Sequence, residues 1–148
     1  MVDIRETRGG LGRVFERLAA FNARHPWSHN DHFHGWIRRH LPKHRRRALD
    51  VGCGPGGLVR LLAARFDLVD GIDIDDDMVA AATANTAGLP GTTIRRRDFA
   101  EVDGGYDLIT MVAVLHHLDL TDGLRHAARL LNHDGRLLVV GLAQPRTH

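Results

Sequence analysis

Apolar and polar residues alternate in blocks along residues 47–142, in a way that predicts strands and helices in turn. Short apolar runs of strand length are separated by stretches in which apolar residues recur at helical spacing. The runs predict five strands, near residues 47–51, 68–73, 92–97, 106–111 and 136–142. Helices are expected between them, near residues 57–66, 75–87 and 121–132. Alternation of this kind indicates an α/β fold with a parallel sheet and helices on both faces.

The first 45 residues have a different pattern, which is helical and polar. Apolar residues within 11–22 fall at helical spacing and predict one amphipathic helix. A histidine-rich, aromatic stretch follows, and a short second helix is expected over 31–40. We therefore divide the chain into an N-terminal helical segment, residues 1–45, and an α/β domain, residues 46–148, which together form one structural unit.

Composition narrows the class of protein. The 148-residue chain has a formal net charge of +2, which is too small to indicate a nucleic-acid or membrane partner. The basic run 43–47 is expected to be a solvated turn, and Asp70 a surface acid. No apolar stretch is long enough to cross a bilayer, and the start has no signal-peptide pattern. The single cysteine, Cys53, cannot form an internal disulfide. We expect a cytoplasmic protein.

The loop after the first predicted strand carries the clearest chemical signal. Residues 50–57 are Asp-Val-Gly-Cys-Gly-Pro-Gly-Gly, and an apolar helical pattern follows directly. Glycine is needed there because the backbone must turn sharply and approach a ligand without Cβ atoms in the way. The N-terminus of the next helix then points at that ligand. The segment therefore predicts a cofactor-binding loop.

Two cofactor classes use a loop of this kind. The dinucleotide fingerprint Gly-x-Gly-x-x-Gly is matched by Gly52, Gly54 and Gly57. The S-adenosylmethionine pattern Asp-x-Gly-x-Gly-x-Gly is matched by Asp50, Gly52, Gly54 and Gly56. A pyrophosphate needs backbone N–H donors and no nearby anion, whereas Asp50 precedes the loop and Pro55 removes a donor from its middle. S-adenosylmethionine carries an ammonium, a sulfonium and no phosphate, so the acid favours the second class.

Acids at the ends of the next strands support this interpretation. In an open parallel sheet, ligands bind at the carboxyl ends of the strands. The second predicted strand ends at Asp73, whose carboxylate can accept hydrogen bonds from two ribose hydroxyls. The third is followed by Asp98, which can accept a hydrogen bond from an adenine amino group, and by Phe99, whose backbone N–H can reach the ring.

With these residues the chain resembles the class I S-adenosylmethionine-dependent methyltransferases, of the small-molecule type with a Leu-His-His-Leu segment after the fourth strand. Here that segment is residues 115–118, and the resemblance covers residues 46–142. It implies a Rossmann-like sheet with strand order 3-2-1-4-5. It also implies transfer of a methyl group from S-adenosyl-L-methionine to a small-molecule acceptor.

The resemblance further implies which residues hold the cofactor. The Gly-rich motif would hold the methionine part, Asp73 the ribose and Asp98 the adenine amino group. Val112 matches a position that gives a backbone contact to the amino group of the cofactor. Residues 27–34 resemble the segment that forms a lid over cofactor and substrate. The expected cofactor-binding residues are Asp50, Gly52, Gly54, Gly56, Asp73, Ile74, Asp98, Phe99 and Val112.

No catalytic residue is assigned from the sequence. Positioning two reactants can supply roughly 7–11 kcal/mol in model systems, so methyl transfer does not require a base. If the acceptor is a hydroxyl, a histidine of the lid segment or His117 is the candidate base, because the unperturbed pKa of about 6.5 suits neutral pH. The side chains of His29, His32 and His34 do not share one helical face, so no metal site is predicted.

The chain departs from the family pattern at its end. Family members continue past the fifth strand with a helix and two antiparallel strands, whereas this chain stops at His148. We expect those last two strands to be absent and the edge of the fifth strand, residues 136–142, to be uncovered and open to self-association. A non-catalytic or truncated cofactor-binding or interaction module is therefore the alternative to an enzyme, and an NAD-dependent dehydrogenase is the second alternative.

Overall fold

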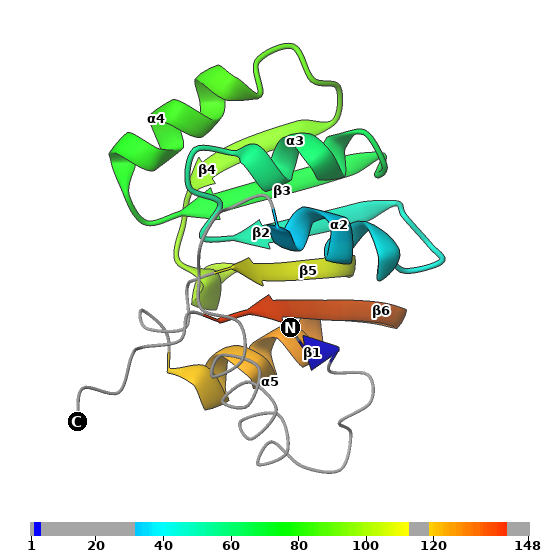
Figure 1. The fold of residues 1–148 in the computed structure, drawn as a ribbon. Coiled ribbons are helices and arrows are strands. Elements are labelled where there is room, and N and C mark those ends of the chain that lie inside the picture. Colours follow the sequence, from blue (N-terminus) through cyan, green and yellow to red (C-terminus); the bar gives the residue numbers. More distant parts are fainter. Residues whose placement is uncertain (1, 4–31, 113–118, 142–148) are drawn as a thin grey trace, which may run out of the picture.

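The structure, a computed structural model, describes residues 2–3, 32–112 and 119–141, which form a six-stranded sheet with helices on both faces (Figure 1). The parallel strands are β2 Arg47–Val51, β3 Leu68–Asp73, β4 Thr92–Arg96, β5 Tyr106–Val112 and β6 Leu131–Val140. Their order across the sheet is β4-β3-β2-β5-β6, and the short strand β1, Val2–Asp3, lies beyond β6. The predicted order 3-2-1-4-5 of the parallel strands is confirmed.

The central strands β2 and β5 are buried along most of their length. Every side chain is buried over residues 48–51 of β2 and 106–111 of β5. Because helices cover both faces of the sheet, these strands are apolar almost throughout and do not alternate. The polar exceptions are Asp50, Asp107 and Thr110. Of these, Asp50 and Thr110 are cross-strand neighbours.

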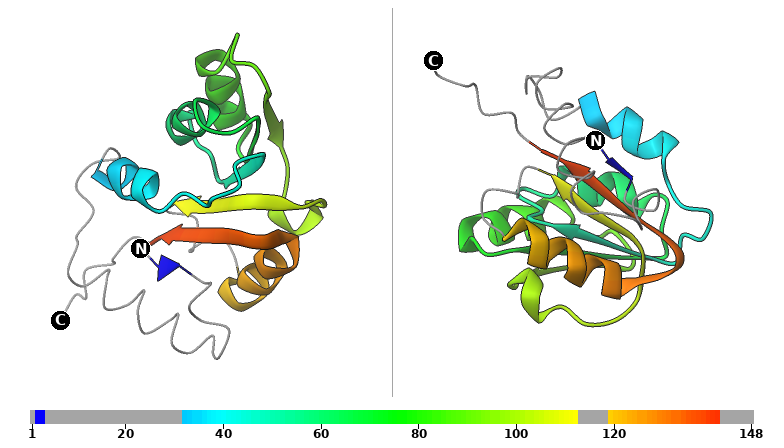
Figure 2. Two further views of the ribbon diagram at one scale, coloured as in Figure 1. Left: turned by 90° about the vertical axis from the view of Figure 1, so that its right-hand side faces the viewer. Right: turned by 90° about the horizontal axis from the view of Figure 1, so that it is seen from below.

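The helices lie on both sides of the sheet (Figure 2). They are α2 His32–Arg39, α3 Gly57–Ala63, α4 Asp76–Asn85 and α5 Leu120–Leu130, with a 3₁₀ helix, η2, at Phe99–Glu101. One apolar cluster lies under α2, α3 and α4, and a second lies under α5 and η2. Each predicted helix of the α/β domain is confirmed and ends a few residues before its predicted end. No helix in the described ranges is long and apolar enough to span a membrane.

The N-terminal segment is described only in part. The predicted helix over 31–40 corresponds to α2, which packs through Phe33 and Ile37 into the cluster with α3 and α4. The predicted helix over 11–22 and most of the expected lid segment, residues 27–31, lie outside the described residues. The division at residue 45 therefore stays a prediction.

Strand β6 differs from its prediction at both its start and its edge. It begins at Leu131, five residues before the predicted start at residue 136. These extra residues form an irregularity in which the register jumps from Tyr106 beside Leu131 to Leu108 beside Arg136. Asp134 adopts a φ of +62° there, which Asp tolerates better than most residues.

The edge of β6 is not bare along its length. Strand β1 pairs with it in antiparallel orientation, with Val2 beside Val139 and Asp3 beside Leu138. The prediction of an uncovered edge is wrong at these positions, because a segment far away in the sequence supplies the missing hydrogen-bond partners. Leu142, the predicted last residue of the strand, lies outside the described residues.

Candidate functional site

The Gly-rich loop joins β2 to α3 at the carboxyl end of the central strand. Gly52, Gly54 and Gly56 have φ values of +68°, +53° and +90°. This region of backbone conformation is accessible to glycine and strained for other residues. The alternate spacing of these glycines in the sequence is therefore required by the path of the loop.

The glycines that distinguish the two cofactor patterns have different surroundings. An added Cβ on Gly56 would lie 3.3 Å from the Cα and Cβ of Ala82 in α4, whereas one on Gly54 or Gly57 would have no such neighbour within 4 Å. Gly54 thus faces open space, and Gly56 permits close packing. In a dinucleotide loop the last glycine of the fingerprint permits close packing of helix and strand. Gly57 has no close neighbour, so the loop fits the pattern that ends at Gly56.

Asp73 connects the Gly-rich loop to the loop after β3. Its Oδ2 accepts a hydrogen bond from the backbone N–H of Gly54 at 3.0 Å, and its Oδ1 accepts one from the N–H of Asp75 at 3.0 Å. Each carboxylate oxygen has further acceptor capacity for ligand hydroxyls. Ile74 follows with 57% of its surface exposed. The structure therefore brings Asp73 against Gly54, with Ile74 exposed beside Asp73 in the chain.

Asp50 is a buried acid with one side-chain donor. Only 2% of its surface is exposed, and the hydroxyl of Thr110 donates to its Oδ1 at 2.8 Å. The pKa of Asp50 is raised to about 7, mainly by burial; the Thr110 hydrogen bond acts against this rise, and the nearby charge of Asp73 adds to it. Burial also raises the pKa of Cys53 to about 12, with further contributions from Asp50 and Asp73. The carboxyl of Asp50 is thus poised to ionise near neutral pH.

Asp98 and Phe99 follow the neighbouring strand β4. The N–H of Arg97 donates to the carbonyl of Asp73 at 3.0 Å, which places Asp98 one residue from that contact. Asp98 is exposed, and its Oδ1 accepts from the N–H of Ala100 at 3.0 Å and so caps η2. The Phe99 side chain is only 3% exposed, so it belongs to the core and leaves only its backbone to a ligand.

Asp98 and Phe99 also border a hollow of about 390 Å³ on the α5 side of the sheet. The rings of Phe99 and His126 meet there edge to face, with centroids 4.9 Å apart. Val112, the last residue of β5, is half-buried.

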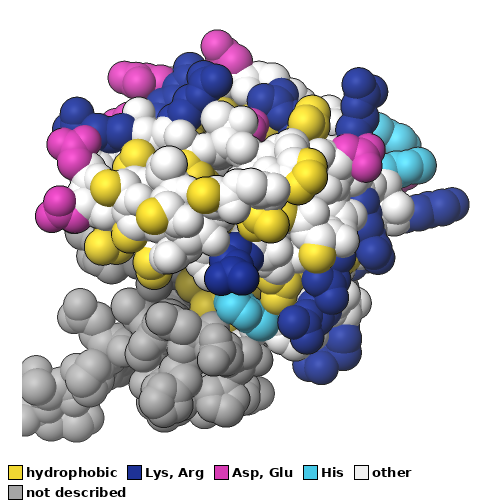
Figure 3. All heavy atoms as spheres, turned by 90° about the horizontal axis from the view of Figure 1, so that it is seen from above, with side chains coloured by type: hydrophobic (Ala, Val, Ile, Leu, Met, Phe, Trp, Pro, Cys, Tyr) yellow, Lys and Arg dark blue, Asp and Glu magenta, His cyan; other side chains and the backbone are white. Residues whose placement is uncertain are grey.

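The three acids form a group that we call the carboxylate edge: Asp50, Asp73 and Asp98, at or next to the carboxyl ends of β2, β3 and β4. None of them forms an ion pair with another described residue. Figure 3 shows most acidic side chains of this face toward the end at which the strands finish, while Lys and Arg side chains are spread over the whole face. This edge is suited to a ligand that carries hydroxyls and positive charge.

Sequence reasoning missed Thr110. A polar residue inside an apolar strand was the available signal, but its partner Asp50 lies 60 residues earlier, so the contact depends on strand register.

The Leu-His-His-Leu segment with His117 lies outside the described residues, so its predicted roles stay predictions. No group of His, Cys, Asp or Glu within the described ranges is arranged to hold a metal ion.

Comparisons with known proteins place this geometry in context. A family model described as a methyltransferase domain matches residues 49–137. An uncharacterized methyltransferase of Mycobacterium bovis is 32% identical over 123 residues, which are 81% of this chain and 62% of that protein. The trans-aconitate 2-methyltransferase of Rhizobium rhizogenes is 38% identical over 86 residues, which are 53% of this chain and 32% of that protein.

A solved structure is similar as well. The magnesium protoporphyrin IX methyltransferase of Synechocystis, with bound S-adenosylhomocysteine, superposes with a TM-score of 0.59 at 30% identity. The match covers 74% of this chain and 52% of that one. The chain thus spans less than two thirds of the length of each of these proteins: 62%, 32% and 52%.

Proposed function

Because the chain belongs to the class I S-adenosylmethionine-dependent methyltransferases, we propose that it binds S-adenosylmethionine at the carboxylate edge and transfers the methyl group to a small-molecule acceptor. The observation that carries the proposal is the Asp73–Gly54 contact. It fixes an acid, with acceptor capacity to spare, against a left-handed glycine that borders open space.

The residues present fit this cofactor. Gly54 leaves room at the point where a Cβ would project toward the ligand. Asp73 offers acceptors to the ribose, Asp98 offers Oδ2 to the adenine amino group, and Asp50 supplies a negative charge for the ammonium. When bound, the cofactor would supply an electrophilic methyl group on its sulfonium. The protein's contribution is to hold both reactants in line.

The acceptor is proposed to be a small molecule, on the strength of the relatives. The trans-aconitate and magnesium protoporphyrin IX methyltransferases are named for small-molecule substrates. If the acceptor is a hydroxyl, His117 or a histidine of the lid segment remains the candidate base. A cofactor-binding module without activity is the competing proposal.

Calorimetric titration with S-adenosylmethionine, S-adenosylhomocysteine and NAD tests the cofactor. Asp73→Ala should weaken S-adenosylmethionine binding by about 1.5–3 kcal/mol, because hydrogen bonds to a charged acceptor are lost. Asp77→Ala is the matched control, since its exposed side chain lies in the first turn of the nearby helix α4 and has no hydrogen-bond partner among the described residues. Equal affinity of the wild type and Asp73→Ala would exclude Asp73 from the site.

Release of S-adenosylhomocysteine in the presence of candidate acceptors then tests the activity. Turnover with a small acceptor supports the enzyme. Tight cofactor binding without turnover on any acceptor, small or macromolecular, would favour the module.

A further inference from the structure

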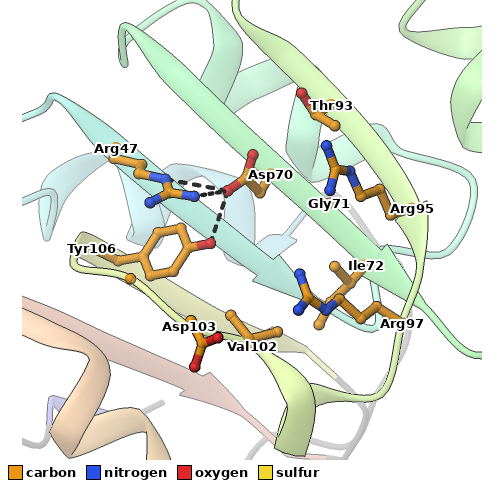
Figure 4. A pocket seen from close by; sticks show the side chains of 11 residues that line it. Arg47, Asp70, Gly71, Ile72, Thr93, Arg95, Arg97, Val102, Asp103 and Tyr106 are labelled. Atoms are coloured by element: carbon orange, nitrogen blue, oxygen red, sulfur yellow. Dashed lines mark hydrogen bonds and ion pairs between the residues drawn. The ribbon is translucent and has the colours of Figure 1, made fainter.

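A hollow of about 370 Å³ lies on the α5 side of the sheet, and no residue of the Gly-rich loop lines it. It exists because residues 97–105, which connect β4 to β5, carry only the short helix η2, so no long helix covers the adjacent part of β3 and β4. We call it the arginine hollow, after Arg47, Arg95 and Arg97, which line it (Figure 4).

Two of these arginines come from one strand and its end. Figure 4 shows the side chains of Arg95 and Arg97 directed from β4 into the hollow. Arg96, between them, does not line the hollow and pairs with Asp76 at 3.3 Å. Arg97 Nη2 donates to the carbonyl of Glu101 at 2.8 Å, and Arg95 makes no hydrogen bond within the described part of the chain. Neither guanidinium therefore has a carboxylate partner among the described residues.

The third arginine is already neutralised. Arg47 Nε and Nη2 donate to Oδ2 of Asp70 at 3.2 and 2.8 Å, and the Tyr106 hydroxyl donates to the same oxygen at 2.8 Å. The guanidinium carbon of Arg47 also lies 4.4 Å from the centre of the Tyr106 ring. Burial, followed by the hydrogen bond to Asp70, raises the pKa of Tyr106, so its hydroxyl remains a donor. The negative charge of Asp70 is thus balanced by Arg47, so it does not balance the positive charge of Arg95 or Arg97.

We propose that the arginine hollow binds a small phosphorylated molecule whose phosphate is held by Arg95 and Arg97. Guanidinium groups present paired donors that match the oxygens of a phosphate. Ile72 and Val102 offer an apolar surface to the organic part, and the volume lies within the range of roughly 300–1,000 Å³ for small-molecule sites. Asp103 at the same hollow can accept a hydrogen bond from a ligand hydroxyl.

Two features set this hollow apart from a surface with scattered arginines. Arg97 is half-buried, and its bond to the Glu101 carbonyl fixes the guanidinium before any ligand arrives. Gly104 has a φ of +99°, and an added Cβ would lie 2.7 Å from Nη1 of Arg47, so the chain passes close to that guanidinium only because a glycine is present. The contact of Arg97 with the Glu101 carbonyl positions one phosphate-binding charge in advance, which lowers the cost of binding. Gly104 instead makes room for Arg47, whose charge is balanced by Asp70.

The test is calorimetric titration of the full chain with ribose 5-phosphate, inorganic phosphate and ribose, at low ionic strength. We expect ribose 5-phosphate to bind more tightly than inorganic phosphate, and ribose not to bind. Arg95→Gln should weaken ribose 5-phosphate binding at least about tenfold, because bonds between charged groups are lost. Arg96→Gln removes the same charge from the same strand outside the hollow, and it should change the affinity less than twofold.

Several outcomes would overturn the proposal. No binding of either phosphate probe at millimolar concentration would do so, as would equal losses in Arg95→Gln and Arg96→Gln, which would indicate diffuse surface charge. Tighter binding of a short DNA duplex, unaffected by Arg95→Gln, would assign the basic surface to nucleic acid instead. Backbone amide shifts of Gly71 and Gly104 in the wild type, measured by NMR with ribose 5-phosphate, locate the ligand independently of any variant. Shifts confined to other residues would exclude the hollow.

Discussion

The carboxylate edge and the arginine hollow lie on the same sheet, and they contain side chains of opposite charge that form no ion pair within the described part of the chain. At the edge, Asp50 and Asp73 are held by a hydroxyl and by backbone N–H groups, which stabilise a carboxylate without cancelling its charge. In the hollow, Asp70 is cancelled by Arg47, and the guanidinium groups of Arg95 and Arg97 remain.

The difference shows how neutral hydrogen-bond donors and ion pairs have different consequences for binding. A carboxylate that is satisfied by neutral donors keeps its field and can attract a cation or an ammonium. A carboxylate paired with arginine contributes to packing, but its charge is balanced. The net charge around it is then set by neighbouring side chains that have no such partner. The ligands proposed for the two regions, a cation with hydroxyls and a phosphate, follow from this contrast.

The largest expected effect concerns the open side of the Gly-rich loop. Gly54→Val should weaken S-adenosylmethionine binding more than a hundredfold, because its side chain would occupy the open space and its φ of +53° strains a β-branched residue. Gly57→Ala is the control, since a Cβ there meets nothing within 4 Å and its φ is not in the left-handed region. Calorimetry measures the affinity and circular dichroism the fold. Tight binding by a folded Gly54→Val protein would remove this loop from the site.

The next effect tests whether the edge keeps a usable negative charge. With a pKa of about 7, Asp50 is ionised above neutral pH, and a cationic ligand should bind about tenfold more weakly for each pH unit below 7. The charged group that faces Asp50 is Asp73, and Cys53 beside them stays neutral because its pKa is raised. Asp50→Asn should flatten the profile. A wild-type affinity that does not vary between pH 5 and 7 would contradict the role of Asp50.

The same ionisation predicts the pH dependence of stability. The pKa of Asp50 in the folded protein lies above the ordinary value for an aspartate, so the folded state holds the proton more tightly than the unfolded state. Its contribution to stability is fully present below about pH 4 and is lost as the pH rises through about 7. Urea unfolding at several pH values should show this loss in the wild type and not in Asp50→Asn.

Thr110 should tune that titration. Thr110→Val removes the only side-chain donor to Asp50 among the described residues, so the pKa of Asp50 should rise and the midpoint of the binding profile should move up by about one pH unit. Thr110→Ser keeps the hydroxyl and should restore the wild-type midpoint. A midpoint that stays in place in Thr110→Val would limit Thr110 to a packing role.

The sequence predicted the five parallel strands and the position of Asp73 at the end of a strand beside the Gly-rich loop, because these depend on local patterns. Apolar runs, glycine spacing and acids at strand ends are all read within a few residues. The register between β2 and β5, which joins Asp50 to Thr110, depends on long-range pairing and has no local signal.

The remaining differences have the same origin. Asp70 was expected to be a surface acid and Arg47 part of a solvated turn, yet they pair across neighbouring strands at 2.8 Å. Strand β1 pairs with β6 from the other end of the sequence. In each case the partner lies far along the chain, and only the assembled sheet brings the two groups together.

The smallest expected effect concerns the support of the arginine hollow. Tyr106→Phe removes one of three hydrogen bonds to Oδ2 of Asp70, and both bonds from Arg47 remain. Because Asp70 is partly exposed, we expect a loss of only about 1 kcal/mol in the free energy of unfolding, measured by urea denaturation. Ribose 5-phosphate affinity should change less than twofold, because Arg95 and Arg97 are untouched. A tenfold loss of affinity in a stable Tyr106→Phe protein would instead mean that Arg47 holds the phosphate in the wild type and loses its position in the variant. The hollow would then resemble the carboxylate edge, because a neutral hydroxyl would position its charged group.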